Sequence, residues 1–252
     1  MITREQLQRF AAANGVPLFT QERDYAQALF LSRLYKLEAP LVFKGGTCVR
    51  LVGGLPRFSE DLDFTATRRP TEIRPLLNRA ADELGMVGMW ARVNKERSTT
   101  DGLRCRLRYH GPLYTGEERT AGSIALEISL RKDIALKPEW RTISPVYPDV
   151  PPFTALCMQV QEVLAEKIRA LFVRAAPRDL YDVWFLLSKG VEPRLSLIDR
   201  KLKLYEKKFD VAIFKTSVVR ARENWARDLA PLLSSVPRFE AVAEGVVLKF
   251  EK

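Results

Sequence analysis

Two aspartates spaced one residue apart, Asp61 and Asp63, have the side chains in this sequence best suited to bind a metal ion. In a strand, the segment DLDFT would direct both carboxylates to one face and Leu62 to the core. Two adjacent carboxylates repel each other, and a divalent cation between them relieves the repulsion. Such oxygen ligands suit Mg²⁺, which proteins usually hold with one or two carboxylates and substrate phosphates.

A double glycine precedes the aspartates in the segment KGGT. Gly45 and Gly46 would let backbone amides approach a triphosphate closely. Thr47 offers a hydroxyl and would cap a short helix through Leu51. A phosphate cradle followed by a metal-binding pair is what nucleotidyl transfer requires, because the metal lowers the charge barrier to attack on the α-phosphorus. A glycine turn beside a solvated acidic strand is the alternative interpretation.

A third carboxylate on a neighbouring strand would complete a two-metal site. In the segment SIALEISLRK, Ile124, Leu126 and Ile128 alternate on one face, so Glu127 points to the other. We therefore take Glu127 as the candidate third ligand. An ordinary solvent-facing glutamate is the alternative.

A helical pattern over residues 159–171 contains a lysine within its apolar stripe, Lys167. A lysine there must extend to solvent, find a partner or reach into a cleft that holds a nucleoside triphosphate. A second helix begins near Pro177, and Arg178 and Asp182 are spaced to pair on it. Asp179 lies in its first turn, where an acidic residue favours the helix dipole whether or not it has a function.

The chain has 252 residues, with 41 Lys and Arg against 31 Asp and Glu, a formal charge of +10. This excess favours polyanionic partners such as nucleic acid. In the segment RCRLRYH, strand alternation places Arg104, Arg106 and Arg108 on one face, where they could meet RNA phosphates. A solvated sheet face is the alternative.

The composition excludes several other classes of protein. A hydrophobic share of 46% excludes disorder, and no apolar run is long enough to span a membrane. A single histidine, His110, excludes two-histidine chemistry such as HExxH. Three separated cysteines without a CxxC pair, and an N-terminus without a signal-peptide pattern, indicate a cytoplasmic protein.

Periodicity predicts an α+β fold in two domains, an α+β domain over residues 1–150 and a helical domain over 151–252. Five prolines make residues 138–152 the expected linker, and residues from Thr154 onward are expected to be mostly helical. Helices are expected over residues 20–37 and 72–84, and strands over residues 41–43, 61–65, 86–93, 104–109 and 124–130.

Four segments together resemble the AbiEii family of nucleotidyltransferase toxins of type IV toxin–antitoxin systems, to which the MenT toxins are related. They are KGGT, RFSEDLDF, EKIRAL and PRDLYDVWFLL, in that order between residues 44 and 187. The resemblance implies a DNA polymerase β-like nucleotidyltransferase core followed by a mainly helical C-terminal domain that completes the active-site cleft.

The resemblance also implies roles for individual residues. Asp61 and Asp63 would bind Mg²⁺, Lys167 would bind the triphosphate, and Asp179 would belong to the active site. Arg57 and Ser59 would brace the metal-binding strand. The implied nucleotide-binding residues are Lys44, Gly45, Gly46, Thr47, Arg57, Ser59 and Lys167.

The expected function is Mg²⁺-dependent transfer of an NMP from an NTP to RNA, at the 3′ acceptor end of tRNA, which would block translation. Glu127 would help deprotonate the attacking hydroxyl, and the arginine row would position the RNA. A cognate antitoxin is the further expected partner. Transfer to a protein or a small molecule, and a non-catalytic nucleotide- or RNA-binding module, are the competing hypotheses. No motif reads a base, so all four NTPs are candidates.

Overall fold

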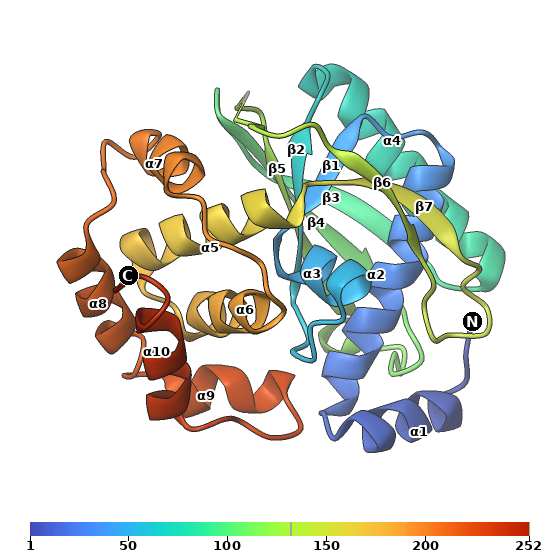
Figure 1. Cartoon of the computed structure of the whole chain (residues 1–252). Helices are drawn as coiled ribbons and strands as arrows, with labels where there is room; N and C mark the ends of the chain where they lie inside the picture. Colours follow the sequence, from blue (N-terminus) through green and yellow to red (C-terminus); the bar gives the residue numbers. More distant parts are fainter. Residues whose placement is uncertain (132, 252) are drawn as a thin grey trace. The chain divides into compact units, whose positions relative to one another are not determined.

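The computed structural model describes residues 1–131 and 133–251 and divides into two compact units (Figure 1). Unit 1 comprises Met1–Ile134 and Pro138–Cys157. Unit 2 comprises Ala135–Lys137 and residues 158–251. The chain mixes helices with one mixed sheet, so the expected α+β class is confirmed.

Among the described residues, the sheet of unit 1 has seven strands in the order β3-β4-β5-β2-β1-β7-β6. β2 is parallel to β5 and β1 is parallel to β7, while the other neighbours are antiparallel. The strands are β1 (Leu41–Lys44), β2 (Asp61–Ala66), β3 (Ala91–Ser98), β4 (Gly102–Tyr109), β5 (Gly122–Ser129), β6 (Glu139–Ile143) and β7 (Phe153–Cys157).

Helices flank this sheet in unit 1 and form the regular structure of unit 2. Those of unit 1 are α1 (Arg4–Asn14), α2 (Leu18–Lys36), α3 (Gly45–Gly53) and α4 (Pro70–Asp82). Those of unit 2 are α5 (Val160–Arg174), α6 (Pro177–Ser188), α7 (Leu195–Lys203), α8 (Val211–Arg220), α9 (Trp225–Leu229) and α10 (Phe239–Val247). Within the described ranges, none of these helices combines the length and apolarity needed to cross a lipid bilayer.

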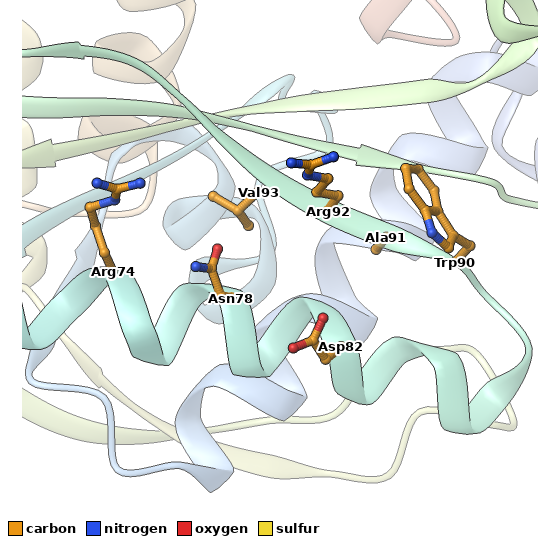
Figure 2. A pocket seen from close by; sticks show the side chains of 7 residues that line it. All are labelled: Arg74, Asn78, Asp82, Trp90, Ala91, Arg92 and Val93. Carbon is orange, nitrogen blue, oxygen red and sulfur yellow. The ribbon is translucent and has the colours of Figure 1, made fainter.

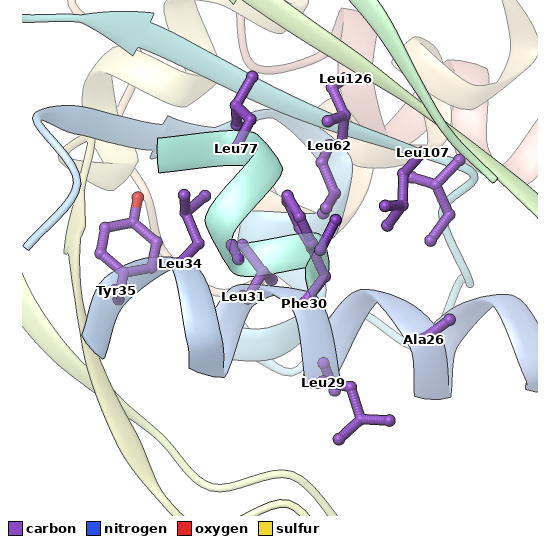
Figure 3. Close-up of a cluster of buried hydrophobic side chains, with 14 of the residues drawn as sticks. Ala26, Leu29, Phe30, Leu31, Leu34, Tyr35, Leu62, Leu77, Leu107 and Leu126 are labelled. Atoms are coloured by element: carbon purple, nitrogen blue, oxygen red, sulfur yellow. The ribbon is translucent and has the colours of Figure 1, made fainter. Parts of the chain in front are cut away.

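The hydrophobic core of unit 1 lies between the sheet and α2 (Figure 3). Phe30 and Leu34 on α2 are fully buried, as the predicted apolar stripe requires, and they lie among Leu62, Leu107 and Leu126 of the strands. Because successive strand residues point to opposite faces, the residues that alternate with these leucines lie on the other face of the sheet. That face carries the candidate carboxylates and the arginine row.

The expected linker at residues 138–152 contains a strand instead, because β6 pairs with β7 there in antiparallel register. The prolines lie beside the strand, and none falls inside it. Residues 153–157 are likewise not helical but form β7, which lies between β1 and the edge strand β6. The two-domain boundary expected at residue 150 stays a prediction.

The strand expected over residues 86–93 begins later, at Ala91. A 3₁₀ helix occupies Glu83–Val87, and Gly88, with φ of 80°, ends it. β3 continues into a polar segment because it is an edge strand, whose exposed residues need no apolar alternation. Periodicity therefore could not locate its end.

Unit 2 contains a buried ion-pair cluster centred on Lys201 of α7. Lys201 Nζ lies 2.5 Å from Glu162 Oε1 and 3.1 Å from Glu166 Oε1, both on α5. Glu162 also accepts hydrogen bonds from the backbone amides of Ala135 and Leu136 at 2.7 and 2.8 Å. Glu162 is fully buried and Lys201 is 1% exposed. The cluster therefore ties α5, α7 and residues 135–137 together.

We expect Lys201→Met to lower the free energy of unfolding by about 3 kcal/mol, because it leaves Glu162 buried without its cationic partner. Urea unfolding measures the loss. Lys203→Met, at an exposed lysine near the end of the same helix, is the control and should change the value by less than about 0.5 kcal/mol. Equal effects of the two variants would show that the cluster does not stabilise unit 2.

Candidate active site

The two candidate metal-binding aspartates lie on β2 in unit 1. Leu62 between them is fully buried, and Asp61 and Asp63 are half-buried on the opposite face. β2 pairs in parallel with β5, and Asp63 lies directly opposite Glu127. The three carboxylates therefore project from one face of two neighbouring strands, as strand alternation predicted.

Glu127 is half exposed, and its Oε1 lies 3.8 Å from Nε of Arg104 on β4. Within residues 1–131 and 133–251, no group of three or more His, Cys, Asp or Glu side chains is arranged to hold a metal ion. The chemistry of the donor set still fits Mg²⁺, because two carboxylates together with substrate phosphates suffice for this ion. The role of Glu127 as third ligand stays a prediction.

Gly45, at the start of α3, lies against the Asp63 carboxylate. Its φ is +76°, and a Cβ atom there would lie 2.7 Å from Asp63 Cγ. Only glycine combines this backbone conformation with so close an approach. Asp63 consequently lies beside the first turn of a helix, where unpaired amides and the dipole favour negative charge. In the structure, the group that lies close to the Gly45 backbone is the Asp63 carboxylate. Contact between Gly45 and a phosphate stays a prediction.

Thr47 is fully buried, and its hydroxyl donates a 2.6 Å hydrogen bond to the backbone carbonyl of Asp61. It does not cap the helix, as the sequence suggested, because α3 begins two residues earlier, with Lys44 as the N-cap. The hydroxyl instead fastens α3 to the strand that carries the aspartates. Lys44 lies opposite Asp63 in the β1–β2 register, which brings a cationic residue beside this carboxylate, and Gly46 is buried in the first turn of α3.

The segment before β2 is anchored by buried polar contacts. The guanidinium of Arg57, a residue only 2% exposed, donates to the carbonyl of Phe58 at 2.7 Å. The carbonyl of Ser59 accepts a 3.2 Å hydrogen bond from Gln27 Nε2 on α2. The bracing role expected of both residues stays a prediction. Their contact with nucleotide stays a prediction.

Sequence reasoning missed Arg50, which holds α3 in place. Arg50 Nε lies 2.6 Å from Asp24 Oδ1 on α2, and its guanidinium stacks 3.4 Å above the centroid of the Phe58 ring. Asp24 also accepts a 2.7 Å hydrogen bond from the hydroxyl of Tyr147. The sequence offered no clear signal for this pair, because the helix over residues 20–37 carries other charged residues besides Asp24.

Lys167 and Asp179 contact each other within unit 2. Lys167 Nζ lies 3.1 Å from Asp179 Oδ1 and 2.7 Å from Asp182 Oδ2. Both aspartates are fully buried, and the lysine side chain is 12% exposed. The lysine in the apolar stripe therefore has found carboxylate partners on α6 and does not extend to solvent. Asp182, expected to pair with Arg178, accepts this contact from Lys167.

Arg174, near the end of α5, also binds Asp179. Its Nε and Nη2 donate to the two carboxylate oxygens at 2.7 and 3.0 Å. Burial alone would raise the pKa of Asp179, but the charges of Lys167 and Arg174 outweigh it and hold that pKa well below its usual range. Asp179 is therefore a permanent anion that positions Lys167. Arg174 was missed, although its place two helical turns after Lys167 could have indicated it.

The arginine row on β4 alternates as predicted, with Cys105, Leu107 and Tyr109 buried on the other face. The arginines themselves carry carboxylate partners. Arg104 Nε lies 3.2 Å from Glu96 Oε2, Arg106 also pairs with Glu96, and Arg108 Nη2 lies 2.5 Å from Glu118 Oε1. These pairs partly neutralise the row, and its contact with RNA stays a prediction.

We expect Asp179→Asn to lower the free energy of unfolding by about 3 kcal/mol at neutral pH, because it removes one partner of a buried ion pair. The folded-state pKa lies below the unfolded value of about 3.9, so this stabilisation is complete at neutral pH and declines as the pH falls below about 4. The difference between wild type and variant in urea unfolding should therefore shrink between about pH 6 and about pH 3.

Asp228→Asn, at a partly exposed aspartate of α9, is the control and should show little difference at either pH. A difference between wild type and Asp179→Asn that stays constant with pH would contradict the ionic origin of the stabilisation.

Comparison with solved structures identifies the same fold in two proteins. The nucleotidyltransferase toxin MenT4 of Mycobacterium tuberculosis is 23% identical, with a TM-score of 0.74, and the match covers 100% of this chain and 89% of MenT4. JHP933 of Helicobacter pylori is 22% identical, with a TM-score of 0.60, and the match covers 91% of this chain and 89% of that one. At these identities the likeness establishes the mixed α+β fold.

No curated protein matches the chain by sequence. A family model does match, described as the nucleotidyl transferase AbiEii toxin of a type IV toxin–antitoxin system, over residues 29–245. The match covers most of the chain and includes the aspartate pair in unit 1 and the Lys167–Asp179 pair in unit 2. The chain therefore belongs to the AbiEii family of nucleotidyltransferase toxins.

Proposed function

We propose that this nucleotidyltransferase transfers an NMP from an NTP to RNA, at the 3′ acceptor end of tRNA, and so blocks translation in the cytoplasm. The observation that carries the proposal is the Asp63 carboxylate held against Gly45 at the start of α3, beside Asp61 on the same strand. This arrangement joins a carboxylate pair to unpaired helix amides, the two features that a triphosphate with its metal requires.

Asp61 and Asp63 would hold the divalent metal, for which we propose Mg²⁺, and the bound ion would neutralise charge on the triphosphate. The first amides of α3, from Gly45 and Gly46, would bind phosphate oxygens. Lys44, beside Asp63, would add a positive charge. Thr47, Arg57 and Ser59 would act indirectly, because they fix the position of α3 and β2.

In the proposed step, the 3′ oxygen of the acceptor forms a bond to the α-phosphorus of the NTP. The bond from that phosphorus to the oxygen bridging to the β-phosphorus breaks, and pyrophosphate leaves with the bonding electrons. The proton of the 3′-hydroxyl passes to a carboxylate, for which we propose Glu127. Asp179 is unsuited to this task, since its lowered pKa makes it a poor proton acceptor at neutral pH.

Lys167 would contribute a positive charge to the triphosphate. Its contacts with Asp179 and Asp182 support this role, because two buried carboxylates restrict the lysine to one orientation. We further propose that unit 1 is a DNA polymerase β-like core. The toxin family also implies a nucleotide substrate and a cognate antitoxin.

We expect Asp63→Asn to reduce transfer of labelled NMP to total tRNA by about a thousandfold, because several kcal/mol of transition-state stabilisation depend on the metal site. The assay supplies each of the four NTPs with Mg²⁺. Asp101→Asn, at an exposed aspartate of the same unit, should leave transfer unchanged. Wild-type transfer by Asp63→Asn would refute the metal site. Label that survives RNase would assign the acceptor to protein.

Gly45→Ala should abolish transfer while the protein stays folded, because the new Cβ displaces the Asp63 carboxylate. Gly54→Ala is a matched control, since Gly54 also has a positive φ, of +71°, but a Cβ there meets nothing within 4 Å. Both variants should lose about 1 kcal/mol of stability from backbone strain, measured in urea. Loss of transfer in both, or in neither, would contradict the role of the Gly45–Asp63 approach.

A further inference from the structure

A polar groove lies at the edge of the sheet, between α4 and the edge strand β3 (Figure 2). Its volume is about 510 Å³, within the size range of small-molecule and cofactor sites. Arg74 and Asn78 project into it from α4, and Trp90 and Arg92 line it from the start of β3. The family motifs and the proposed reaction use none of these residues.

Trp90 is the open end of a column of three aromatic rings. Its ring centroid lies 4.3 Å from that of His110, and His110 is stacked on Tyr114 at 3.6 Å with an angle of 8°. The backbone amide of His110 donates to the carbonyl of Trp90 at 2.9 Å, which fixes the two residues together. Trp90 remains 49% exposed. A rigid, half-exposed aromatic face of this kind suits the stacking of a nucleic-acid base.

The two arginines of the groove are available for phosphates. Among the residues that the structure describes, neither Arg74 nor Arg92 has an ion-pair partner, in contrast to the arginine row of β4, in which every member is paired with glutamate. Asp82 is the one acidic side chain in the groove lining, so two guanidiniums face one carboxylate. The net positive charge favours a polyanion.

Strand register places Arg92 of the groove lining on the carboxylate face of the sheet. Ala91 and Val93, opposite Tyr109 and Leu107, point to the core face that α4 covers, so the groove lies at the edge of the sheet. Asp61 lies opposite Ala125, Ala125 opposite Arg106, and Arg106 opposite Asn94 of β3. Arg92, two residues before Asn94, therefore shares the face of Asp61, three strands away. Three spacings of about 4.8 Å and an offset of two residues, at about 3.4 Å each, make this distance roughly 16 Å, which a short single-stranded end can span.

We infer that this groove binds an unpaired nucleotide of the acceptor RNA a few residues before its 3′ end. The base stacks on Trp90, and Arg92 and Arg74 contact the flanking phosphates. The inference rests on the proposed transfer to RNA and assigns the residues that orient the acceptor. An RNA strand fits better than a protein segment, because apart from Trp90 the apolar lining is limited to Ala91 and Val93.

Fluorescence anisotropy with a labelled single-stranded RNA oligonucleotide tests the inference. We expect Trp90→Ala to weaken binding by about tenfold or more, and Trp90→Phe to retain most of it, because an aromatic face is what the base requires. Trp140→Ala is the matched control, since Trp140 is 63% exposed on β6 at the opposite edge of the sheet. It should bind as wild type does.

Arg92→Gln should reduce the slope of log binding constant against log salt by about 0.7, the value for one phosphate contact on a single strand. Asp63→Asn keeps the groove intact, so it should bind the oligonucleotide normally even though its transfer activity is strongly reduced. This separates failure of the groove from failure of the proposed reaction. Wild-type binding by Trp90→Ala, or equal loss in Trp140→Ala, would overturn the inference.

Discussion

The close approach of the Asp63 carboxylate to the backbone of Gly45 is the constraint on which the candidate site depends. Two carboxylates on one strand repel each other, and the start of α3 offers the positive partial charges that reduce this cost. The approach requires a residue without a side chain at Gly45. The hydrogen bond from Thr47 to Asp61 and the pairing of Arg50 with Asp24 hold the helix at this distance.

Unit 2 contains charged side chains that are buried and paired with one another. Lys167, Asp179 and Asp182 are largely removed from water, and their mutual contacts offset the desolvation of each. Neighbouring charges hold the pKa of Asp179 well below its ordinary range despite burial, so this carboxylate stays ionised at physiological pH. The cluster around Lys201 uses the same principle without any part in the proposed chemistry. In unit 2, the buried charges around Lys201 therefore have a structural role, and those around Lys167 are candidates for a role in the reaction.

Much of the fold followed from local pattern. The helix over residues 20–37 and the strands at residues 41–43, 61–65, 104–109 and 124–130 were predictable, since each segment has an apolar pattern typical of its element. Prediction from hydrophobic pattern failed for strands that are not buried enough to require a regular apolar alternation. β3 is a polar edge strand, and β6 lies in a proline-rich segment whose strand character arises only from pairing with β7.

The sequence by itself determined the candidate chemistry: two aspartates on one strand face, a glycine pair, a lysine in an apolar stripe and the motif order of a toxin family. Only the tertiary structure decided the partners of these groups. Parallel pairing placed Glu127 opposite Asp63, and packing of α5 on α6 brought Arg174 and Lys167 to Asp179. Partners of this kind lie on different elements, and periodicity describes only which face of its own element a residue occupies.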